Sequence, residues 1–268
     1  MTEVLAHLHA PLLPNKDAIS AAFGRAAEHY DQHAELQRKV ADRLLDKLPN
    51  DLSGCRVLDL GCGTGYCAQQ LLLRGAEVVC ADLSAEMLTE AQRRCGIENV
   101  TYQLADAEQL PFTSAEFDYV VSSLALQWCA DLSIPLREMK RVTRAGGAVF
   151  FSSLIDGSLK ELKRSWGKID AYQHVNDFTT LNQVKIALAQ SGCRDHQLDL
   201  PEMVMWYRTA LGLMKDLKGI GANHVEGRSK GFTGKQALRA LEMEYQKYAN
   251  QDGLLPASYQ ICLGSVAL

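Results

Sequence analysis

An apolar run that ends in an acid and three alternating glycines is the strongest sign of chemistry in this chain. Residues 57–65 read Val-Leu-Asp-Leu-Gly-Cys-Gly-Thr-Gly. The glycines Gly61, Gly63 and Gly65 let the backbone pass close to a ligand without a side-chain clash. A dinucleotide-binding loop reads G-x-G-x-x-G instead and directs a helix N-terminus at pyrophosphate, so a nicotinamide-dependent dehydrogenase is disfavoured. The observed spacing after Asp59 suits a ligand that bears an amino group and no phosphate.

Two further acids follow the next two apolar runs. Asp82 lies seventeen positions after Gly65, close to the spacing of about 20 residues expected for a carboxylate that bonds ribose hydroxyls. Asp106 follows a candidate strand over residues 100–103 and could accept a hydrogen bond from an exocyclic amine. Adenine has such an amine, so the three acids together predict a site for an adenosine-like ligand.

The elements that must position these acids are short strands that alternate with helices. Apolar runs at 57–60, 78–81, 119–121 and 148–151 predict four strands, separated by helical periodicity. Such alternation predicts a parallel sheet in a doubly wound, Rossmann-like α/β fold, in which ligands bind at the carboxyl ends of the strands. We expect the sheet to be mostly parallel, closed by a C-terminal antiparallel strand.

The rest of the chain divides into a cap, insertions and closing elements. We expect residues 1–50 to form an N-terminal extension and helical cap, and residues 51–268 to form one domain. Within that domain we expect a helical insertion at about 156–190 and a Gly-rich lid segment at about 215–235. The periodicity predicts helices over 16–48, 158–172, 180–190, 209–217 and 235–248, and strands over 198–206 and 258–266.

Composition excludes several classes of protein. The 268 residues are 47% hydrophobic, with Lys+Arg 28 against Asp+Glu 32 and a net charge of -4, so most of the chain is ordered and a dedicated nucleic-acid binder is disfavoured. No apolar stretch approaches the ~20 residues of a membrane span. The eight cysteines form no CxxC pair, which predicts no metal and indicates reduced thiols in a cytoplasmic protein.

Beyond the acids and glycines, three segments carry a family resemblance. The region from Gly54 to Leu154 resembles the class I S-adenosylmethionine-dependent methyltransferases. The resemblance lies in the residues above and in the segments 104–108 (Leu-Ala-Asp-Ala-Glu), 117–123 and 141–147. The resemblance implies S-adenosylmethionine as cofactor. It implies that the methionine end is held by Asp59, Gly61, Gly63 and Gly65, the ribose by Asp82, and the adenine by Leu83, Asp106 and Ala107.

The segment after the fourth strand excludes some classes of methyl acceptor. Methyltransferases that act on base amines often have an Asn/Asp-Pro-Pro-aromatic run there, whereas residues 122–126 read Ser-Ser-Leu-Ala-Leu. There is also no carboxylate cluster with the spacing of a divalent-metal site. We therefore expect metal-independent O-methylation.

Four segments outside the cofactor motifs resemble the malonyl-acyl carrier protein O-methyltransferases, the BioC family of biotin synthesis. These segments are 22–31, 124–129, 157–162 and 217–224. The resemblance implies methylation of the free carboxylate of malonyl-acyl carrier protein or malonyl-CoA, which starts pimeloyl synthesis, and it adds Tyr30 and Ser123 to the cofactor site. Ser123 departs from the family, which often has Asn there, and Thr64 stands where some members have Pro.

A malonyl carboxylate is ionised near neutral pH because an ordinary carboxyl pKa is about 4. We therefore expect no general base, and we expect neutral or shared donors to hold the carboxylate, because a strong ion pair would weaken the nucleophile. The candidate substrate-binding residues are Gln127, Trp128, His174, Asn176 and Asn223, each of which could instead be structural.

A local basic patch predicts the carrier protein as partner. The segment 215–239 has six basic and two acidic residues, and carrier proteins are generally acidic, so the patch would steer their encounter. Its members are Lys215, Lys218, Arg228, Lys230, Lys235 and Arg239, which could also form an ordinary solvated surface. The alternatives to the assigned activity are a methyltransferase of another small carboxylate or quinone-like acceptor and a non-catalytic S-adenosylmethionine-binding module.

Overall fold

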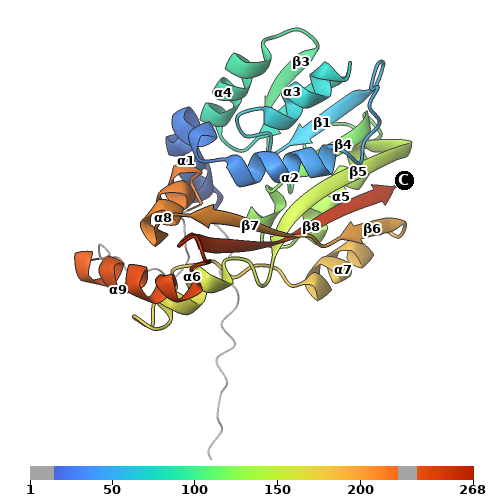
Figure 1. Cartoon of the computed structure of the whole chain (residues 1–268). Helices are drawn as coiled ribbons and strands as arrows, with labels where there is room; N and C mark the ends of the chain where they lie inside the picture. The colour runs from blue at the N-terminus through green and yellow to red at the C-terminus, as the bar shows by residue number, and fades with distance from the viewer. Residues whose placement is uncertain (1–14, 223–233) are drawn as a thin grey trace, which may run out of the picture.

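A mixed β-sheet forms the centre of the computed structural model, which describes residues 15–222 and 234–268 (Figure 1). The strand order is β3-β2-β1-β4-β5-β8-β6, and β7 also pairs with β8. The strands are β1 (Arg56–Leu60), β2 (Glu77–Asp82), β3 (Val100–Leu104), β4 (Phe117–Ser123), β5 (Thr143–Ile155), β6 (His196–Asp199), β7 (Glu202–Tyr207) and β8 (Leu255–Ala267).

Strands β1 to β5 are parallel, and β8 is antiparallel to β5. Successive residues of β1 and β2 enter different cores: Val57 and Val78 pack on one side of the sheet, and Leu58 and Val79 pack on the other. A parallel sheet buried on both faces requires strands that are apolar throughout, which explains the unbroken apolar runs. The predicted doubly wound fold with a C-terminal antiparallel strand is confirmed.

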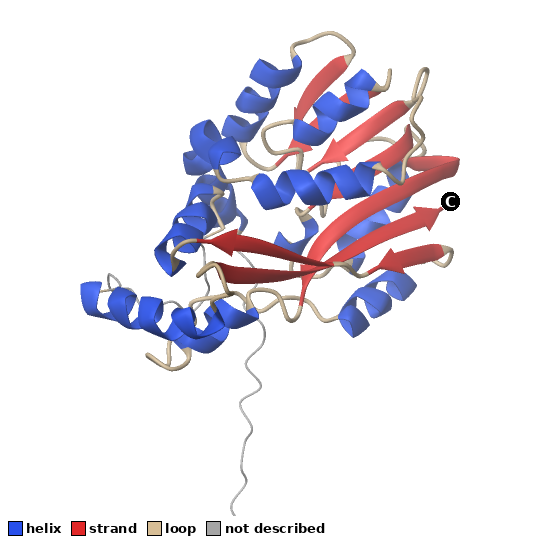
Figure 2. Ribbon diagram, viewed as in Figure 1, coloured by secondary structure: helices blue, strands red, loops and turns tan. Residues whose placement is uncertain are grey.

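Helices cover both faces of this sheet (Figure 2). Apolar side chains of α2, α3 and α4 pack into one core, and those of α5 and α7 pack into the other. The helices, with short 3₁₀ segments marked η, are α1 (Lys16–Ala26), η1 (Ala27–Gln32), α2 (Glu35–Leu45), α3 (Tyr66–Leu73), α4 (Ala85–Cys95), η2 (Leu126–Trp128), α5 (Ser133–Val142), α6 (Lys160–Trp166), α7 (Leu181–Gln190), α8 (Ala210–Gly219), α9 (Lys235–Tyr245) and η3 (Gln246–Tyr248).

The N-terminal helix expected over residues 16–48 is wrong as a single element, because α1, η1 and α2 replace it. Helix α1 begins after Asn15, whose side chain accepts a hydrogen bond from the N–H of Ala18 at 3.0 Å. The 3₁₀ turn then brings Asp31 to the loop after β1, where Thr64 Oγ1 donates to Asp31 Oδ1 at 2.8 Å. A contact with a distant loop therefore fixes the interruption, which helical periodicity alone does not predict.

Two expected elements in the second half also differ. The strand expected over residues 198–206 is divided into β6 and β7, because Pro201 has no N–H for a ladder; its carbonyl still accepts from Ile261 N–H at 3.0 Å. The helix expected over residues 158–172 ends at Trp166. Beyond it, the Asp170 side chain accepts from Tyr172 N–H at 3.0 Å and favours a turn.

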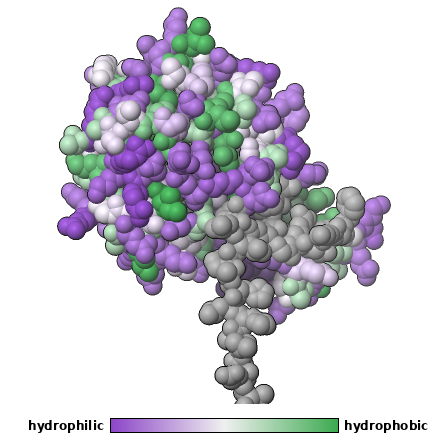
Figure 3. Space-filling view, turned by 180° about the vertical axis from the view of Figure 1, so that it is seen from behind, coloured by the Kyte–Doolittle hydropathy of each residue, from purple (hydrophilic) through white to green (hydrophobic). Residues whose placement is uncertain are grey.

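The surface of the described residues is mainly polar on the face shown in Figure 3, with apolar residues in small scattered groups. None of the helices in the described ranges is long and apolar enough to cross a membrane. The described residues also contain no group of three or more His, Cys, Asp or Glu side chains that could hold a metal ion.

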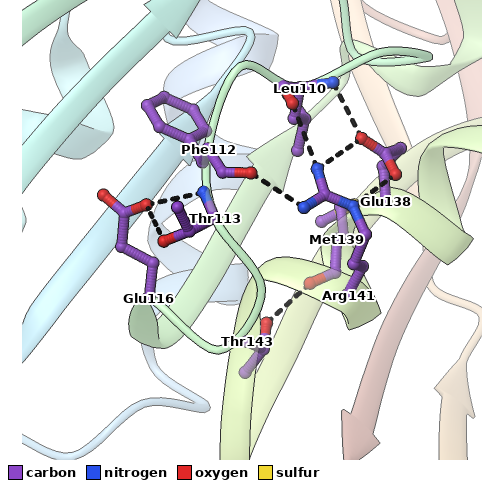
Figure 4. Close-up of polar contacts among 8 residues, drawn as sticks. All are labelled: Leu110, Phe112, Thr113, Glu116, Glu138, Met139, Arg141 and Thr143. Carbon is purple, nitrogen blue, oxygen red and sulfur yellow. Dashed lines mark hydrogen bonds and ion pairs between the residues drawn. The ribbon is translucent and has the colours of Figure 1, made fainter.

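Arg141 fastens the segment after β3 to α5 (Figure 4). Its guanidinium forms a two-pronged ion pair with Glu138, at 2.7 Å for each prong, and donates to the carbonyls of Phe112 at 2.8 Å and Leu110 at 3.1 Å. Glu138 in turn accepts from Leu110 N–H at 2.8 Å. This network fixes the loop that begins with Asp106, and a planar fork is required to reach all three partners.

We expect Arg141→Lys to lower the free energy of unfolding by about 1–3 kcal/mol, because the three donors of an ammonium lie on one atom and cannot reproduce the four hydrogen bonds of the guanidinium. Chemical denaturation measures this change. Arg144→Lys is the matched control, since Arg144 forms one exposed ion pair with Asp118 and such pairs contribute at most about 1 kcal/mol. Equal effects of the two substitutions would contradict the role given to the Arg141 fork.

Candidate active site

The loop after β1 lies where the carboxyl end of that strand meets α3. Gly61, Gly63 and Gly65 all have positive φ, at 70°, 53° and 82°. A Cβ on Gly61 would overlap the Cβ of Ala125, so this glycine is needed for packing. A Cβ on Gly63 would meet nothing within 4 Å. Gly63 is therefore the glycine of this loop at which the backbone borders open space, as a ligand-binding position requires.

Asp59 lies beneath this loop and is almost completely buried. Its Oδ2 accepts a hydrogen bond from the N–H of Ala68 at 2.9 Å, in the first turn of α3, where a helix dipole favours negative charge. Burial raises the pKa of Asp59 to about 7, and the nearby charge of Asp82 contributes, while the Ala68 N–H acts in the opposite direction. Asp59 therefore holds α3 to β1 and is easily protonated.

Asp82 connects the ends of β1 and β2. Its Oδ2 accepts from Gly63 N–H at 2.8 Å, and its Oδ1 accepts from Ser84 N–H at 2.9 Å. Burial raises the pKa of Asp82 although both N–H groups lower it. The next residue, Leu83, receives a hydrogen bond on its carbonyl from Ser20 Oγ at 3.0 Å. The parallel register thus brings the acid expected to bind ribose against the glycine loop.

At the end of β3, the sequence did not predict the principal partner of Asp106. Lys16 Nζ lies 2.5 Å from Asp106 Oδ2 and also pairs with Glu108. An adenine amine bound at Asp106 would have to share this carboxylate with the ammonium or displace it. Ala107 lies between the two acids, at the start of the loop that Arg141 fastens. The interaction joins residues 90 positions apart, so no local pattern reveals it.

The N-terminal segment covers the ends of β1, β2 and β3 through these contacts. Figure 1 shows α1 beside α4 and close to α8, at the edge where these strands end. Arg94 on α4 pairs with Asp31 in addition to the Thr64 bond described above. The cap expected at the N-terminus thus contacts each loop that holds a predicted cofactor-binding acid or glycine, and its role there remains a prediction.

A cavity of about 650 Å³ opens beside this covered edge. This volume lies within the range of about 300–1,000 Å³ typical of small-molecule sites. Its walls come from the N-terminal segment, the residues after β4, the loop 173–179 and α8. The structure brings five predicted site residues together here: Tyr30, Gln127, Trp128, His174 and Asn176. Asn223, the remaining substrate candidate, lies outside the described residues.

Tyr30 connects the cavity with the acids at the strand ends. It lines the cavity, and burial raises the pKa of its phenol, with the charges of Asp82 and Asp31 raising it further. It is therefore a neutral hydrogen-bond donor near neutral pH. Ser123, at the end of β4, lies elsewhere: its Oγ is 3.2 Å from Ser152 Oγ, and Ser152 Oγ accepts from Leu124 N–H at 2.9 Å. Ser123 is thus bonded to β5 and is not among the cavity-lining residues.

Gln127 and Trp128 form one wall on η2. The backbone N–H of Leu154 donates to Gln127 Oε1 at 3.3 Å, which assigns the oxygen of this amide and leaves its NH₂ as a donor. Trp128 packs edge-on against Phe23 of α1, with ring centroids 5.3 Å apart. This wall thus combines an apolar surface with one oriented donor.

His174 lies in the loop that follows α6. Its ring stacks on Trp166 with centroids 3.8 Å apart, and its Nε2 is 2.8 Å from Asp170 Oδ1. The side chain is only 9% exposed, so the solvated histidine that is usual for such a loop is not what the fold forms here. Three polar lining residues that the sequence did not suggest also reach the cavity: His33, Tyr207 and Asp216.

The described members of the basic patch lie on two helices. Lys215 and Lys218 are exposed on α8, and Lys235 and Arg239 are exposed on α9. Arg228 and Lys230 lie outside the described residues. The proposal of a carrier-protein surface therefore stays a prediction.

The parallel sheet with acids at three strand ends, a glycine loop and an adjoining cavity define a Rossmann-like methyltransferase. Residues 58–151 match the family model described as a methyltransferase domain. The YcgJ protein from Bacillus subtilis has the same fold, with a TM-score of 0.61 and 18% identity over 85% of this chain and 98% of that one.

Sequence relatives are more specific. A malonyl-[acyl-carrier protein] O-methyltransferase of Yersinia pestis is 40% identical over 259 residues, which cover 96% of this chain and 93% of that protein. One of Pectobacterium atrosepticum is 42% identical over 253 residues, which cover 94% and 96%. The chain belongs to the malonyl-[acyl-carrier protein] O-methyltransferase family, and the resemblance found in the sequence is confirmed.

We expect Asp59→Asn to stabilise the protein above neutral pH. The raised pKa means that the native state retains a proton that the unfolded chain has lost, so the wild type loses stability between about pH 4 and pH 7. Asparagine avoids this loss and keeps an oxygen for Ala68 N–H. The expected gain is about 1–4 kcal/mol at pH 8 and shrinks towards pH 4, as measured by chemical denaturation at each pH.

Asp51→Asn is the matched control, because Asp51 is exposed and hydrogen bonds with Ser53 lower the pKa of that carboxyl. It should give no gain at pH 8. A gain for Asp59→Asn that does not change with pH would refute the assignment of the raised pKa to this residue.

Proposed function

We propose that this protein methylates the free carboxylate of malonyl-acyl carrier protein, with S-adenosylmethionine as methyl donor, to give the methyl ester that starts pimeloyl synthesis for biotin. The observation that carries the proposal is the cavity of about 650 Å³ beside the acid-lined strand ends, in a chain that matches this family over 96% of its length.

The residues at the strand ends fit the cofactor. Asp59 and Asp82 are acids whose pKa values are raised by burial, so a ligand with a cationic amino group and hydroxyl donors would compensate them. Open space at Gly63 admits such a ligand close to the backbone. S-adenosylmethionine supplies a methyl group on a positively charged sulfur.

The roles within the cofactor set follow the order of the strands. Asp59 and the glycine loop face the methionine end, Asp82 the ribose, and Leu83, Asp106 and Ala107 the adenine. Tyr30 closes the set on the side of the cavity as a neutral donor, and Ser123 supports it from the end of β4. Lys16 would have to move or share Asp106 as the adenine amine binds.

The acceptor carboxylate needs no general base, because it is ionised near neutral pH. The protein accelerates transfer by orientation and exclusion of water, and orientation alone contributes roughly 7–11 kcal/mol to lowering a barrier of this kind. Gln127 provides an oriented amide donor, while Trp128 and Phe23 exclude water from one wall. His174 and Asn176 line the wall contributed by the loop 173–179.

The cysteines support a cytoplasmic location for the protein. All eight cysteines lie within the described ranges and are free thiols, which supports a reducing cytoplasm. Fatty-acid carrier proteins would be met there, and the basic patch would attract their acidic surfaces.

The proposal is tested by transfer of labelled methyl from S-adenosylmethionine to malonyl-acyl carrier protein, with acetyl-acyl carrier protein as the control that lacks a free carboxylate. We expect label on the malonyl form alone, released by mild ester hydrolysis. No label on either, despite measured cofactor binding, would refute the proposal in favour of another small acceptor or a non-catalytic binding module. Malonyl-CoA in the same assay measures preference for the carrier.

We expect charge reversal in the basic patch to weaken the encounter with the carrier. Lys218→Glu combined with Arg239→Glu should lower kcat/KM for malonyl-acyl carrier protein about tenfold at low salt, because the rate constant of association depends on complementary charge. The difference should shrink at high salt. Lys185→Glu, at an exposed position of α7, is the matched control, and an equal loss with malonyl-CoA would contradict a role in carrier recognition.

A further inference from the structure

Three polar side chains line the cavity between the N-terminal segment and α8. His33 Nδ1 lies 2.7 Å from Asp216 Oδ1, and burial together with the charge of the same carboxylate raises the pKa of the Tyr207 phenol. All three residues line the cavity. The bond between His33 and Asp216 joins residues 183 positions apart. This contact has no role in the cofactor site described above.

This geometry sets the orientation of the imidazole. An ionised carboxylate only accepts hydrogen bonds, so Nδ1 of His33 carries the hydrogen and donates it to Asp216. Nε2 is therefore the ring nitrogen left for another partner. The ring also lies against the backbone of α8, because a Cβ placed on Gly219 would come within 2.1 Å of His33 Cδ2, 2.3 Å of Cγ and 2.8 Å of Nε2. His33 is therefore fixed by Asp216 at one edge and by the bare backbone of Gly219 at another.

The position of His33 relative to Tyr30 is set by the 3₁₀ turn. Side chains three residues apart in such a turn lie above one another, so His33, which follows directly after η1, is one turn beyond Tyr30. Tyr30 is the lining residue whose phenol responds to the charge of Asp82. His33 is thus the next polar group along the cavity from the cofactor-facing end.

Among the described residues that line the cavity, histidine is the side chain that can offer a positive charge to an anionic acceptor. The described lining includes no lysine or arginine, while four acids reach it: Glu35, Asp131, Asp177 and Asp216. The lining groups that can become positive in these ranges are His33 and His174. Of the two, His33 lies on the segment shared with Tyr30, so it is the one placed near the reacting end.

We propose that His33, held by Asp216, binds the acceptor carboxylate through Nε2–H as an imidazolium. This inference rests on the proposed function, since it requires a carboxylate acceptor. The positive charge is shared with Asp216, so the carboxylate is oriented without the strong ion pair that would reduce its nucleophilicity. An unshared lysine at the same place would bind the anion more tightly and slow its attack.

Binding by this route involves a proton. Histidine changes its charge between about pH 5 and pH 8, and binding that requires an imidazolium therefore weakens as the pH rises. The titratable groups that line the cavity on the neighbouring elements are Asp216 on α8, Tyr207 on β7, Glu35 on α2 and Tyr30 on η1. KM for the acceptor should therefore rise with pH above neutrality, and this rise should depend on His33.

The experiment compares His33→Gln, Asp216→Asn and Gly219→Ala with His29→Gln, an exposed histidine on η1 that does not line the cavity. KM and kcat for malonyl-acyl carrier protein are measured from pH 6 to pH 9, together with the dissociation constant for S-adenosylmethionine and the melting temperature. We expect His33→Gln to raise KM at least tenfold at pH 7 and to flatten its rise with pH. Cofactor affinity should stay within twofold, and His29→Gln should match the wild type.

Asp216→Asn and Gly219→Ala should raise KM by smaller factors, because they disturb the ring without removing it. An unchanged KM in His33→Gln, or a pH dependence that persists in it, would overturn the inference.

Failure of the proposed function is distinguishable, because it is seen in the wild type as cofactor binding without methyl transfer. In that event, calorimetry with malonyl-CoA and acetyl-CoA, in the presence of S-adenosylhomocysteine, measures carboxylate-dependent binding directly. Loss of the malonyl preference in His33→Gln supports the inference. Its retention, or its absence from the wild type, overturns the inference.

Discussion

The buried carboxylate of Asp59 is the feature on which the rest of the site depends. It ties the first turn of α3 to β1 through a single N–H of Ala68, and so fixes the glycine loop between them. Burial makes its charge costly and brings its pKa to about 7. Asp82 lies near enough to raise that cost further, and it holds the same loop through Gly63. Two buried carboxylates close to one another favour a cationic ligand and disfavour a phosphate.

Charged side chains of the N-terminal segment bind the loops that follow β1 and β3. Lys16 pairs with the acids after β3, and Asp31 binds Thr64 and Arg94 around the first loop. The segment thereby becomes a cover for the cofactor loops and, through Tyr30 and His33, a wall of the cavity. One short 3₁₀ turn therefore belongs to both halves of the site. Under the proposed function, η1 would help the sheet to bring cofactor and acceptor together.

The sequence predicted those parts of the molecule that depend on local pattern. The short apolar runs, the candidate strand over residues 100–103 and the acids that accompany them placed β1 to β5 and the three carboxylates, because parallel strands bring their ends to one edge. The division of β6 from β7 was also within reach, since Pro201 lacks the N–H that a continuous strand needs. Lys16 with Asp106, His33 with Asp216 and Arg141 with the loop after β3 were not predictable, because each pairs side chains that only the tertiary fold brings together.

Helix α8 separates the groups that we propose attract an acidic carrier from the residues that line the cavity. Asp216, Leu217 and Ile220 line the cavity, whereas Lys215 and Lys218 are exposed on the same helix. The strong cations are thus kept on the outer surface, where charge increases the rate of encounter. The described lining contains acids, amides and two histidines, so a carboxylate inside it meets donors of moderate strength. The lysines of α8 thus lie on the outer surface, while His33 and His174 line the cavity from other elements. Under the proposed function, this separation makes long-range attraction compatible with a nucleophile that remains free to attack.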